Sequence, residues 1–396
     1  MNRIEKLLQK FCPDGVEFKA LGEVWIKAEK SKFGVNQIKQ ILATQENGYK
    51  CFTSGIKSYF VSQFLVNGEY IFMNDGGFAD IKYYDGKAFY TDHTFCFTTT
   101  QINVKFLYYF LKMNQNLINS IYFQGTGLKN LNKNKIATFK IPIPPLEIQK
   151  EIVLILDAFT ELQAELQAEL QARQKQYEFY REKLLSIEAL EKRAEGYGVK
   201  MMSLGEVGEF VRGNGLQKKD FVEFGVPCIH YGQIYTYYGT FTHQTKSFVS
   251  EAVAKKLKKA QSGNLIIAGV SENKEDVCKA VVYLGDDEIC ISGDSFAFSH
   301  SQNPKFVGYF FQSEQFHKQK SKCITGTKVM RVHIDSLKNF QIPIPPLKVQ
   351  NEVVEILDKF DALVNDISQG LPAEITARKK QYEHYREKLL SFKEKA

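Results

Sequence analysis

The chain has 396 residues, of which 44% are hydrophobic and 24% are charged, and Lys plus Arg outnumber Asp plus Glu by 52 to 45. This length suggests two or three domains, and the composition excludes collagen-like, disordered and membrane-spanning classes of protein. The net charge of +7 hints at a polyanionic partner.

Targeting segments and disulfides are not expected. No stretch approaches the eighteen or so continuous apolar residues of a membrane helix, and the N-terminal residues lack the apolar core of a signal peptide. We therefore expect a cytoplasmic protein. The seven cysteines are scattered and never form Cys-x-x-Cys, which argues against a disulfide framework and against a zinc site.

Residues 1–140 are predicted to form a mixed α/β domain, the first head. An Asp85-Gly86 hairpin turn is expected between its last two strands, and a helix is expected to begin after Asn103, a residue type that caps helices. The strands are predicted at 60–66, 69–73, 81–84 and 88–90. Four polar or basic residues are candidates for contact with phosphates or bases, although each could equally be solvated surface: Lys30, Lys32, Asn36 and Lys57.

Residues 141–198 are predicted to form a long helix that begins near Pro145 and ends near Arg193. From Ile148 to Leu166, apolar residues recur at steps of four and three, which is the pattern of a helix packed along another helix. At ~1.5 Å per residue, about fifty residues would span roughly 70 Å, too long for an element inside a compact domain. We therefore interpret the segment as a rod.

Within this rod, Glu-Leu-Gln-Ala occurs three times in succession, over residues 161–172. One four-residue unit adds ~6 Å and roughly 40° beyond a full helical turn. Compared with the rise and twist of DNA, a change of one unit would therefore alter the spacing of the domains at the two ends of the rod by about one or two base pairs. The alternative is a low-complexity run of good helix formers without a role as a ruler.

Residues 199–340 are predicted to repeat the plan of the first head, with a helix after Asn303. The strands are expected at 265–268, 280–284, 288–291 and 295–298. Guanidinium and amide groups pair with guanine and adenine edges, and lysines meet phosphates. The candidates for DNA contact in this second head are Arg212, Asn214, Gln217, Lys218, Lys219, Tyr231, Gln233, Lys255 and Lys256.

Residues 341–396 are predicted to form a second rod, with a kink at Gly370-Leu371-Pro372. The two rods can pair as antiparallel helices in a coiled coil, which predicts an α+β fold with two tandem heads in a pseudo-twofold dumbbell. The residues expected to pair the helices or meet a partner are Ile152, Phe159, Tyr177, Tyr180, Arg181, Val353, Phe360, Tyr382, Tyr385 and Arg386.

An internal repeat supports this four-part division. Phe-Lys-Ile-Pro-Ile-Pro-Pro-Leu-Glu-Ile-Gln at 139–149 returns at 340–350 with three differences, and Tyr-Glu-Phe-Tyr-Arg-Glu-Lys-Leu-Leu-Ser at 177–186 returns at 382–391 with one. Gly-Thr precedes each proline run. The heads carry net charges of +7 and +4, and the rods −4 and 0, so the basic excess lies in the heads, as expected of parts that bind a polyanion.

Motifs of catalysis were sought and are missing from the sequence. It contains no Gly-x-x-x-x-Gly-Lys-Ser/Thr loop, no His-Glu-x-x-His, no Gly-x-Ser-x-Gly and no Asn-Pro-Pro-Tyr/Phe tetrad of adenine methyltransferases. The seven histidines share no metal-ligand spacing. We expect neither catalysis nor a bound metal in this chain.

Two variable heads, each closed by Gly-Thr and Ile-Pro-Ile-Pro-Pro-Leu-x-x-Gln and followed by helices ending Lys-Gln-Tyr-Glu-x-Tyr-Arg-Glu-Lys-Leu-Leu, resemble the DNA specificity subunit of a type I restriction-modification system. The resemblance covers nearly the whole chain. It implies that each head is a target recognition domain for one half of a split, asymmetric double-stranded DNA sequence. It also implies that the four-residue repeats set the spacing and that the helices dock two methyltransferase subunits and, through them, ATP-dependent restriction subunits.

The resemblance further implies that S-adenosylmethionine, Mg²⁺ and ATP belong to the partner subunits and that this chain binds no cofactor. Two alternatives remain open from the residues. One is a coiled-coil adaptor that joins proteins without nucleic acid, and the other is a DNA-acting enzyme, a nuclease or methyltransferase, that works alone.

Overall fold

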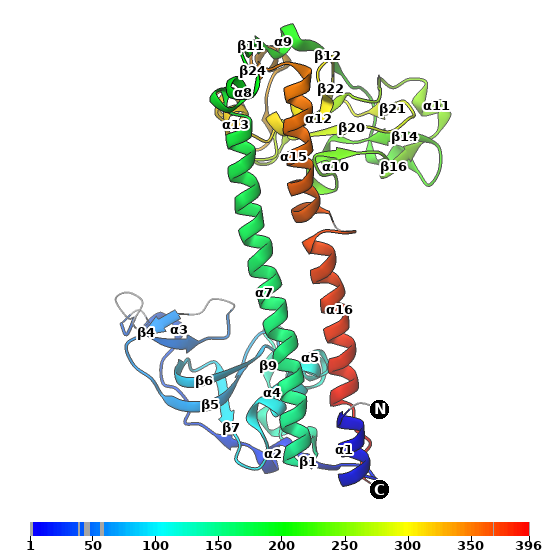
Figure 1. Ribbon diagram of the computed structural model, residues 1–396. Coiled ribbons are helices and arrows are strands. Elements are labelled where there is room, and N and C mark those ends of the chain that lie inside the picture. Colours follow the sequence, from blue (N-terminus) through cyan, green and yellow to red (C-terminus); the bar gives the residue numbers. More distant parts are fainter. Residues whose placement is uncertain (1–2, 39, 43–47, 56–58, 367, 396) are drawn as a thin grey trace. The chain divides into compact units, whose positions relative to one another are not determined.

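The computed structural model describes residues 3–38, 40–42, 48–55, 59–366 and 368–395. The chain divides into two compact units, Met1–Glu165 with Ile375–Ala396, and Leu166–Glu374. Each unit holds one head and parts of the long helices (Figure 1). The exact boundaries predicted for heads and rods remain a prediction.

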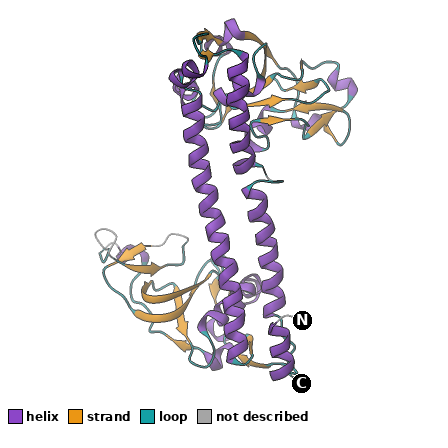
Figure 2. Cartoon of the chain, viewed as in Figure 1, coloured by secondary structure: helices purple, strands orange, loops and turns teal. Residues whose placement is uncertain are grey.

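The first head is built on a six-stranded sheet of order β2-β7-β5-β6-β3-β4, in which only β3 and β6 run parallel. Figure 2 draws strands as orange arrows and helices in purple. The strands are β2 Ile26–Lys27, β3 Tyr49–Phe52, β4 Tyr59–Val61, β5 Val66–Asn74, β6 Ile81–Tyr90 and β7 Thr94–Thr98. Helix α4 (Val104–Met113) packs on β5 and β6 and buries Phe106, Leu107 and Leu111. Asn103 caps α4, as predicted, by accepting a hydrogen bond from the Phe106 N–H at 2.9 Å.

The remaining elements of this head are short. They are α1 Arg3–Phe11, β1 Glu17–Ala20, α2 Leu21–Val24, α3 Val35–Ile38, α5 Gln115–Tyr122, β8 Phe123–Gln124, β9 Asn130–Leu131, α6 Lys133–Ile136 and β10 Lys140–Ile143. Strand β1 pairs antiparallel with β10, whose residues come from the first proline-rich motif. This pairing ties the start of the head to the start of the long helix.

The hairpin predicted at Asp85-Gly86 is wrong, because β6 runs through it without a break. Gly86 (φ +134°) lies opposite Gly68 (φ +113°) on β5, so two glycines that accept positive φ face each other across the strands. The chain therefore stays extended where Asp-Gly would ordinarily turn. The strand predicted at 60–66 is also divided, since β4 ends at Val61 and β5 begins at Val66.

The second head contains two five-stranded sheets, of order β12-β22-β18-β20-β15 and β13-β16-β14-β21-β17. Its strands are β12 Gly208–Arg212, β13 Phe221–Val222, β14 Val226–Ile229, β15 Phe241–Thr242, β16 Ser247–Val249, β17 Lys259–Ala260, β18 Leu265–Ala268, β20 Ala280–Tyr283, β21 Ile289–Ile291 and β22 Ser295–His300. The four strands predicted from sequence are therefore present, within one or two residues at their ends.

Helices and connecting elements complete the second head. They are α8 Ile187–Arg193, β11 Lys200–Ser203, α9 Leu204–Val207, the 3-10 turn Lys218–Asp220, α10 Tyr231–Thr236, α11 Glu251–Ala254, β19 Val270–Ser271, α12 Pro304–Phe310, α13 Glu314–Ser321, β23 Met330–Arg331, α14 Ile334–Lys338 and β24 Gln341–Ile344. Asn303 caps α12 as Asn103 caps α4. Strands β11 and β24 pair as β1 and β10 do. The duplicated motifs thus make the same joint in both heads.

The long helices are α7 (Leu146–Leu184), α15 (Leu347–Asn365) and α16 (Leu371–Leu390). The prediction of one helix reaching Arg193 is wrong: Ser186 leaves the helical conformation and caps α8 by accepting a hydrogen bond from the Ala189 N–H. The kink predicted at Gly370-Leu371-Pro372 is a complete break between α15 and α16. Within the described residues, none of the helices has an apolar run that could cross a membrane.

Each head is fastened to its helix by the glutamine that ends the repeated proline motif. Gln149 accepts a hydrogen bond from the Asn103 N–H and donates one to the Pro144 carbonyl, both at 2.7 Å. Gln350 makes the equivalent bonds to Asn303 and Pro345, both at 2.9 Å. Both glutamines are almost fully buried. The Pro144 and Pro345 carbonyls precede the first hydrogen-bonded turn of their helices, which begins at the Pro145 and Pro346 carbonyls, so the buried amide supplies the donor that the helix does not.

His300, at the end of β22, is expected to make stability depend on pH. Its ring lies against Phe298, and burial lowers the pKa of its imidazole from 6.5 to about 4. As the pH falls below about 6.5, the unfolded state takes up this proton before the folded state does, so the free energy of unfolding falls until about pH 4. The expected loss from pH 6.5 to pH 5 is about 2 kcal/mol for this residue.

Urea unfolding of the whole chain at pH 7 and at pH 5 measures this effect. The His300→Gln variant should show a smaller difference between the two pH values than the unmodified chain. An equal difference in both proteins would show that His300 does not titrate in this range.

Candidate nucleic-acid interface

Four of the predicted DNA-contact residues of the second head line one pocket of about 440 Å³. Arg212 ends β12, Gln217 and Lys218 follow in the next loop, and Tyr231 begins α10. The turn formed by Ser292, Gly293 and Asp294 closes the other side. The pocket thus combines a guanidinium, an amide, an ammonium and an aromatic ring on loops at the edge of the sheets.

Arg212 is oriented by the turn but remains accessible. Its Nε donates a hydrogen bond to the Gly293 carbonyl at 3.1 Å, and its Nη2 lies 3.9 Å from a carboxylate oxygen of Asp294. The side chain is 68% exposed. An exposed guanidinium of fixed direction can pair with the two acceptors of a guanine edge.

His230 also lines this pocket, as a neutral imidazole. Burial and the nearby Lys218 ammonium lower its pKa, so at pH 7 it carries no charge. Its Nδ1 accepts a hydrogen bond from the Gly232 N–H at 3.2 Å, which leaves the proton on Nε2. The ring lies against Tyr231 in a tilted arrangement with centroids 4.4 Å apart, and the Tyr231 N–H donates a hydrogen bond to Ser292 Oγ. Tyr231 is therefore a positioned aromatic surface.

Two predicted base readers use their side-chain amides in hydrogen bonds to other residues of the second head. Asn214 donates to the Lys256 carbonyl at 2.8 Å and accepts from the Lys258 N–H at 2.6 Å. Gln233 accepts from the His230 N–H and donates to Ser247 Oγ at 2.7 Å. The Asn214 amide thereby holds the loop that contains Lys255, Lys256 and Lys258 next to the pocket. Lys219 and the loop residues Lys255 and Lys256 are exposed.

In the first head, Lys30, Lys32 and Asn36 are exposed on one segment. This segment is held by hydrogen bonds from the Ala28 N–H to the Cys96 carbonyl and from the Asp92 N–H to the Phe33 carbonyl. The turn that contains Asp92 corresponds to the turn at Gly293, because the Thr94 N–H bonds to the Thr91 carbonyl in the first and the Ser295 N–H bonds to the Ser292 carbonyl in the second. Lys57, the fourth predicted residue, lies outside the described residues.

Sequence reasoning missed two hairpin loops that adjoin this edge. In the first head, the Lys129 carbonyl accepts a hydrogen bond from the Gly77 N–H, next to Asp75, whose N–H is bound by the His93 carbonyl. In the second head, β23 pairs with β19, and the preceding Gly269 N–H is bound by the Asp294 carbonyl. Leu128 is 73% exposed and Val329 46% exposed at the two tips, beside Lys129 and Lys328. The repeated Gly-Thr pair was the feature of the sequence from which these two loops could have been predicted.

The predicted pairing residues make contacts along the helices within each unit. In the first unit, the Phe159 ring lies 6.2 Å from Tyr382 and 5.6 Å from Tyr385, and Arg386 lies over Tyr382. Ile152 is fully buried there.

The second unit repeats this arrangement. The Phe360 ring lies 6.4 Å from Tyr177 and 5.3 Å from Tyr180, and Arg181 lies over Tyr177. Val353 is fully buried. Among the described residues, no three His, Cys, Asp or Glu side chains are placed to hold a metal ion.

The comparison with protein families gives two matches in tandem. The type I restriction modification DNA specificity domain matches residues 13–173 and 197–377. A putative type I restriction enzyme specificity subunit of Haemophilus influenzae is 31% identical over 98% of both chains. A type I restriction enzyme specificity subunit of Escherichia coli is 34% identical over 73% of this chain and 71% of that protein.

Solved structures share the fold. The S subunit of a type I restriction-modification system from M. genitalium superposes with a TM-score of 0.60 at 16% identity, over 95% of this chain and 96% of that one. A second chain, from a structure of type I restriction-modification complex assembly, gives a TM-score of 0.56 at 17% identity, over 96% of this chain and 98% of that one. These likenesses confirm the α+β class with two tandem mixed domains and long helices.

The predicted role of a specificity subunit, rather than an enzyme, is confirmed by the family match and by both relatives. The two matched segments cover most of the chain, one in each half. The chain therefore belongs to the family of type I restriction-modification DNA specificity subunits.

Proposed function

We propose that each head reads one half of a bipartite, asymmetric double-stranded DNA target. The observation that carries this proposal is the pocket of the second head, where Arg212 is oriented by Gly293 and stands with Lys218 and Tyr231. Arg212 reads a base edge, and the lysine loop at 255–256 neutralises phosphate. In the first head, Lys30, Lys32 and Asn36 occupy the corresponding edge.

The hairpin loops at 125–130 and 325–331 contact DNA without reading its sequence. The two heads differ between their shared motifs, as two half-sites require, whereas these loops share the Gly-Thr turn. Lys129 and Lys328 make no ion pair with a described residue and so are available to phosphate. Both loops adjoin the edge that carries the reading residues.

The long helices dock two methyltransferase subunits and, through them, the restriction subunits. The naming of the relatives as restriction enzyme specificity subunits supports this assembly. S-adenosylmethionine, Mg²⁺ and ATP are bound by those partners in the cytoplasm, and the docked methyltransferases act on the DNA that the heads select. The four-residue repeats in α7 set the distance between half-sites.

Salt-dependent DNA binding by the chain with its methyltransferase tests the assignment of residues. The Arg212→Ala variant is expected to lower the ratio of specific to random-DNA affinity by about 5- to 150-fold, the value of one bidentate base contact. The Lys129→Ala variant should weaken both affinities alike and reduce the slope of log affinity against log salt by about 0.9. Lys318→Ala, which removes a lysine already paired with Glu314 at 3.0 Å, is the matched control.

The result that contradicts the proposal is DNA binding that is absent or insensitive to salt when the methyltransferase is present. That result would favour a coiled-coil adaptor. Methylation or cleavage of DNA by the purified chain alone, with S-adenosylmethionine or Mg²⁺, would instead support an enzyme that works without partners.

A further inference from the structure

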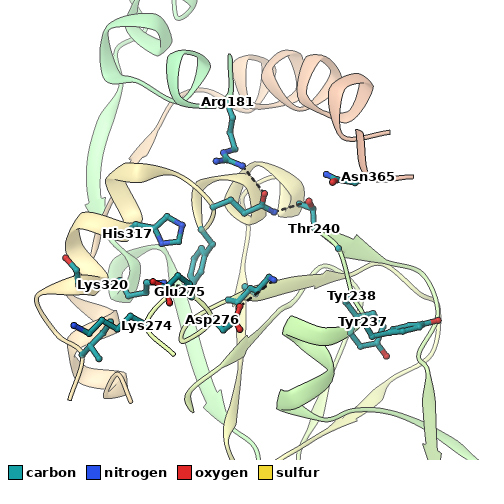
Figure 3. Close-up of a pocket in the computed structure, with 17 residues that line it drawn as sticks. Arg181, Tyr237, Tyr238, Thr240, Lys274, Glu275, Asp276, His317, Lys320 and Asn365 are labelled. Carbon is teal, nitrogen blue, oxygen red and sulfur yellow. Dashed lines mark hydrogen bonds and ion pairs between the residues drawn. The ribbon is translucent and has the colours of Figure 1, made fainter. Parts of the chain in front are cut away.

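A pocket lies at the joint between head and helices in each of the two units. In the second unit it measures about 800 Å³ and is walled by Arg181 of α7, by Gln312 and by the segment that contains Lys274, Glu275 and Asp276 (Figure 3). In the first unit it measures about 640 Å³ and is lined by Arg386 of α16 together with Lys105, Lys112 and Tyr382. The second unit's pocket shares no lining residue with the Arg212 pocket.

The two arginines occupy the same position of the repeated Tyr-Arg-Glu-Lys-Leu-Leu motif. The guanidinium of Arg181 lies 5.4 Å from the Tyr177 ring centre, and that of Arg386 lies 5.3 Å from the Tyr382 ring centre. Both Nε atoms are buried and have no hydrogen-bond partner. A buried N–H without an acceptor is destabilising, so its occurrence at both equivalent positions points to an acceptor that arrives with a ligand.

The remaining donors of the arginines are only weakly engaged. Arg181 reaches Gln312 and Glu182 at 3.4 Å each, which is long for a hydrogen bond. Arg386 makes no hydrogen bond or ion pair with any residue that the structure describes. The planar guanidinium presents Nε and one Nη side by side, a geometry that matches the two oxygens of a carboxylate.

The acids around the two arginines do not balance the basic groups of the pockets: Glu182 lies 3.4 Å from Arg181, and Arg386 has no ion-pair partner among the described residues. In the first unit, Lys105 is paired with Asp157 at 2.7 Å and Lys112 with Asp80 at 3.1 Å, so the two lysines are matched. Glu161 also lines this pocket but lies beyond ion-pair distance of Arg386.

In the second unit, Lys279 lies 3.8 Å from Asp276, while the ammonium of the buried Lys320 donates to the Glu275 carbonyl at 2.9 Å. The lining residues Arg181, Lys274, Lys279 and Lys320 against Glu275 and Asp276 give this pocket a formal charge of +2, which the Glu182 carboxylate beside Arg181 reduces to +1. Burial, Lys320 and Arg181 lower the pKa of His317, so its imidazole adds no charge at pH 7.

We propose that each pocket receives the carboxylate of an acidic side chain of a partner protein, bound side-on by Nε and Nη of Arg181 in one unit and of Arg386 in the other. Because the same arginine is duplicated, the two occupants are two copies of one partner. This inference rests on the proposed docking of two methyltransferase subunits and gives the chemistry of that docking. The pockets belong to the joints rather than to the loop edge, which favours a protein over DNA as the occupant.

Native mass spectrometry and titration calorimetry of the full chain with its methyltransferase test the proposal. The unmodified chain should bind two copies. Arg181→Gln and Arg386→Gln should each weaken the binding of one copy by about 10- to 100-fold, the value of hydrogen bonds to a charged group. The double variant should weaken both. Arg181→Lys keeps the charge but not the paired N–H groups, and should restore only part of the affinity.

The chain supplies a matched control eight residues earlier on each helix. Arg173 and Arg378 also occupy equivalent repeat positions, but Arg173 is already bound to Glu169 and Gln176, and Arg378 to Gln381. Arg173→Gln and Arg378→Gln should leave both affinities unchanged. Thermal unfolding of every variant shows whether it is folded.

Three results would overturn the inference, and they are distinguishable. Two copies bound with unchanged affinity by a folded double variant would remove the role of the pockets while leaving methyltransferase docking intact. No copy bound by the unmodified chain would reject the docking itself. Unchanged partner binding, combined with inorganic phosphate raising the melting temperature of the unmodified chain but not of the double variant, would identify a small anion as the occupant.

Discussion

Deletion of residues 165–168 is expected to keep both half-sites of the DNA target and to shorten the gap between them by about one or two base pairs. These residues form the middle Glu-Leu-Gln-Ala unit inside α7, which is one continuous helix of 39 residues. Removing the unit withdraws ~6 Å and rotates the helix ends by roughly 40° relative to each other. Methylation at the original spacing should fall by roughly 100-fold or more, since one half-site is then out of register.

The measurement is methylation of a panel of duplexes that differ only in the length of the gap. A variant of the same length and composition, Glu165→Gln with Gln167→Glu, is the control and should keep the original preference. An unchanged preference in the deletion variant would mean that the repeat is a run of helix-forming residues without a ruler function.

Replacement of Gln350 by Ala is expected to destabilise the second unit by about 3 kcal/mol, because the Asn303 N–H and the Pro345 carbonyl lose the partner that a buried side chain gives them. Gln350 is fully buried and also donates to Gln302 at 2.8 Å. Gln149→Ala should have a similar effect in the first unit, where the same two bonds are present. Urea unfolding of each variant gives the change in the free energy of unfolding.

The conservative variant and a surface control sharpen this test. Gln350→Glu retains an acceptor for the Asn303 N–H but loses the donor to Pro345, so an intermediate loss is expected. Gln171→Ala, on an exposed position of α7, should change the free energy of unfolding by less than about 0.5 kcal/mol. If Gln350→Ala is as stable as the unmodified chain, the hydrogen bonds of Gln350 to Asn303 and Pro345 do not stabilise the attachment of the head to its helix.

Much of the fold could be predicted because its signals are local. The caps Asn103 and Asn303, and strands such as β18, follow from residue type and short-range pattern. The failures arose where a distant partner decides the conformation. Gly86 stays extended because Gly68 faces it across the sheet, and no local pattern reveals that pair.

The helix ends show a second limit. The sequence predicts a helix that continues beyond Leu184 to Arg193, but Ser186 caps a new helix, and Leu185 and Leu190 are buried in the same core as Val349 and Val353. That packing favours a change of direction over continuation. Ser186, a residue type that caps helices, was therefore a signal for a helix end that the apolar periodicity alone does not reveal.

For the candidate site, the residue types predicted which loops form the pocket, but they did not predict what each side chain does there. Arg212, Lys218 and Tyr231 come together, as a polar loop next to a second loop allows. Asn214 and Gln233 have the amides expected of base readers but hold neighbouring loops instead. The unpartnered Nε atoms of Arg181 and Arg386 follow from side-chain packing around the joints, which a repeat in the sequence marks but does not describe.

Sequencing of methylated bases in DNA modified by the chain and its methyltransferase tests the central claim, that each head specifies one half of the target. The unmodified chain is predicted to give a two-part motif with a fixed gap, and Arg212→Ala to relax only one of the two parts. A single continuous motif, or relaxation of both parts by this one substitution, would contradict the assignment of one half-site to each head.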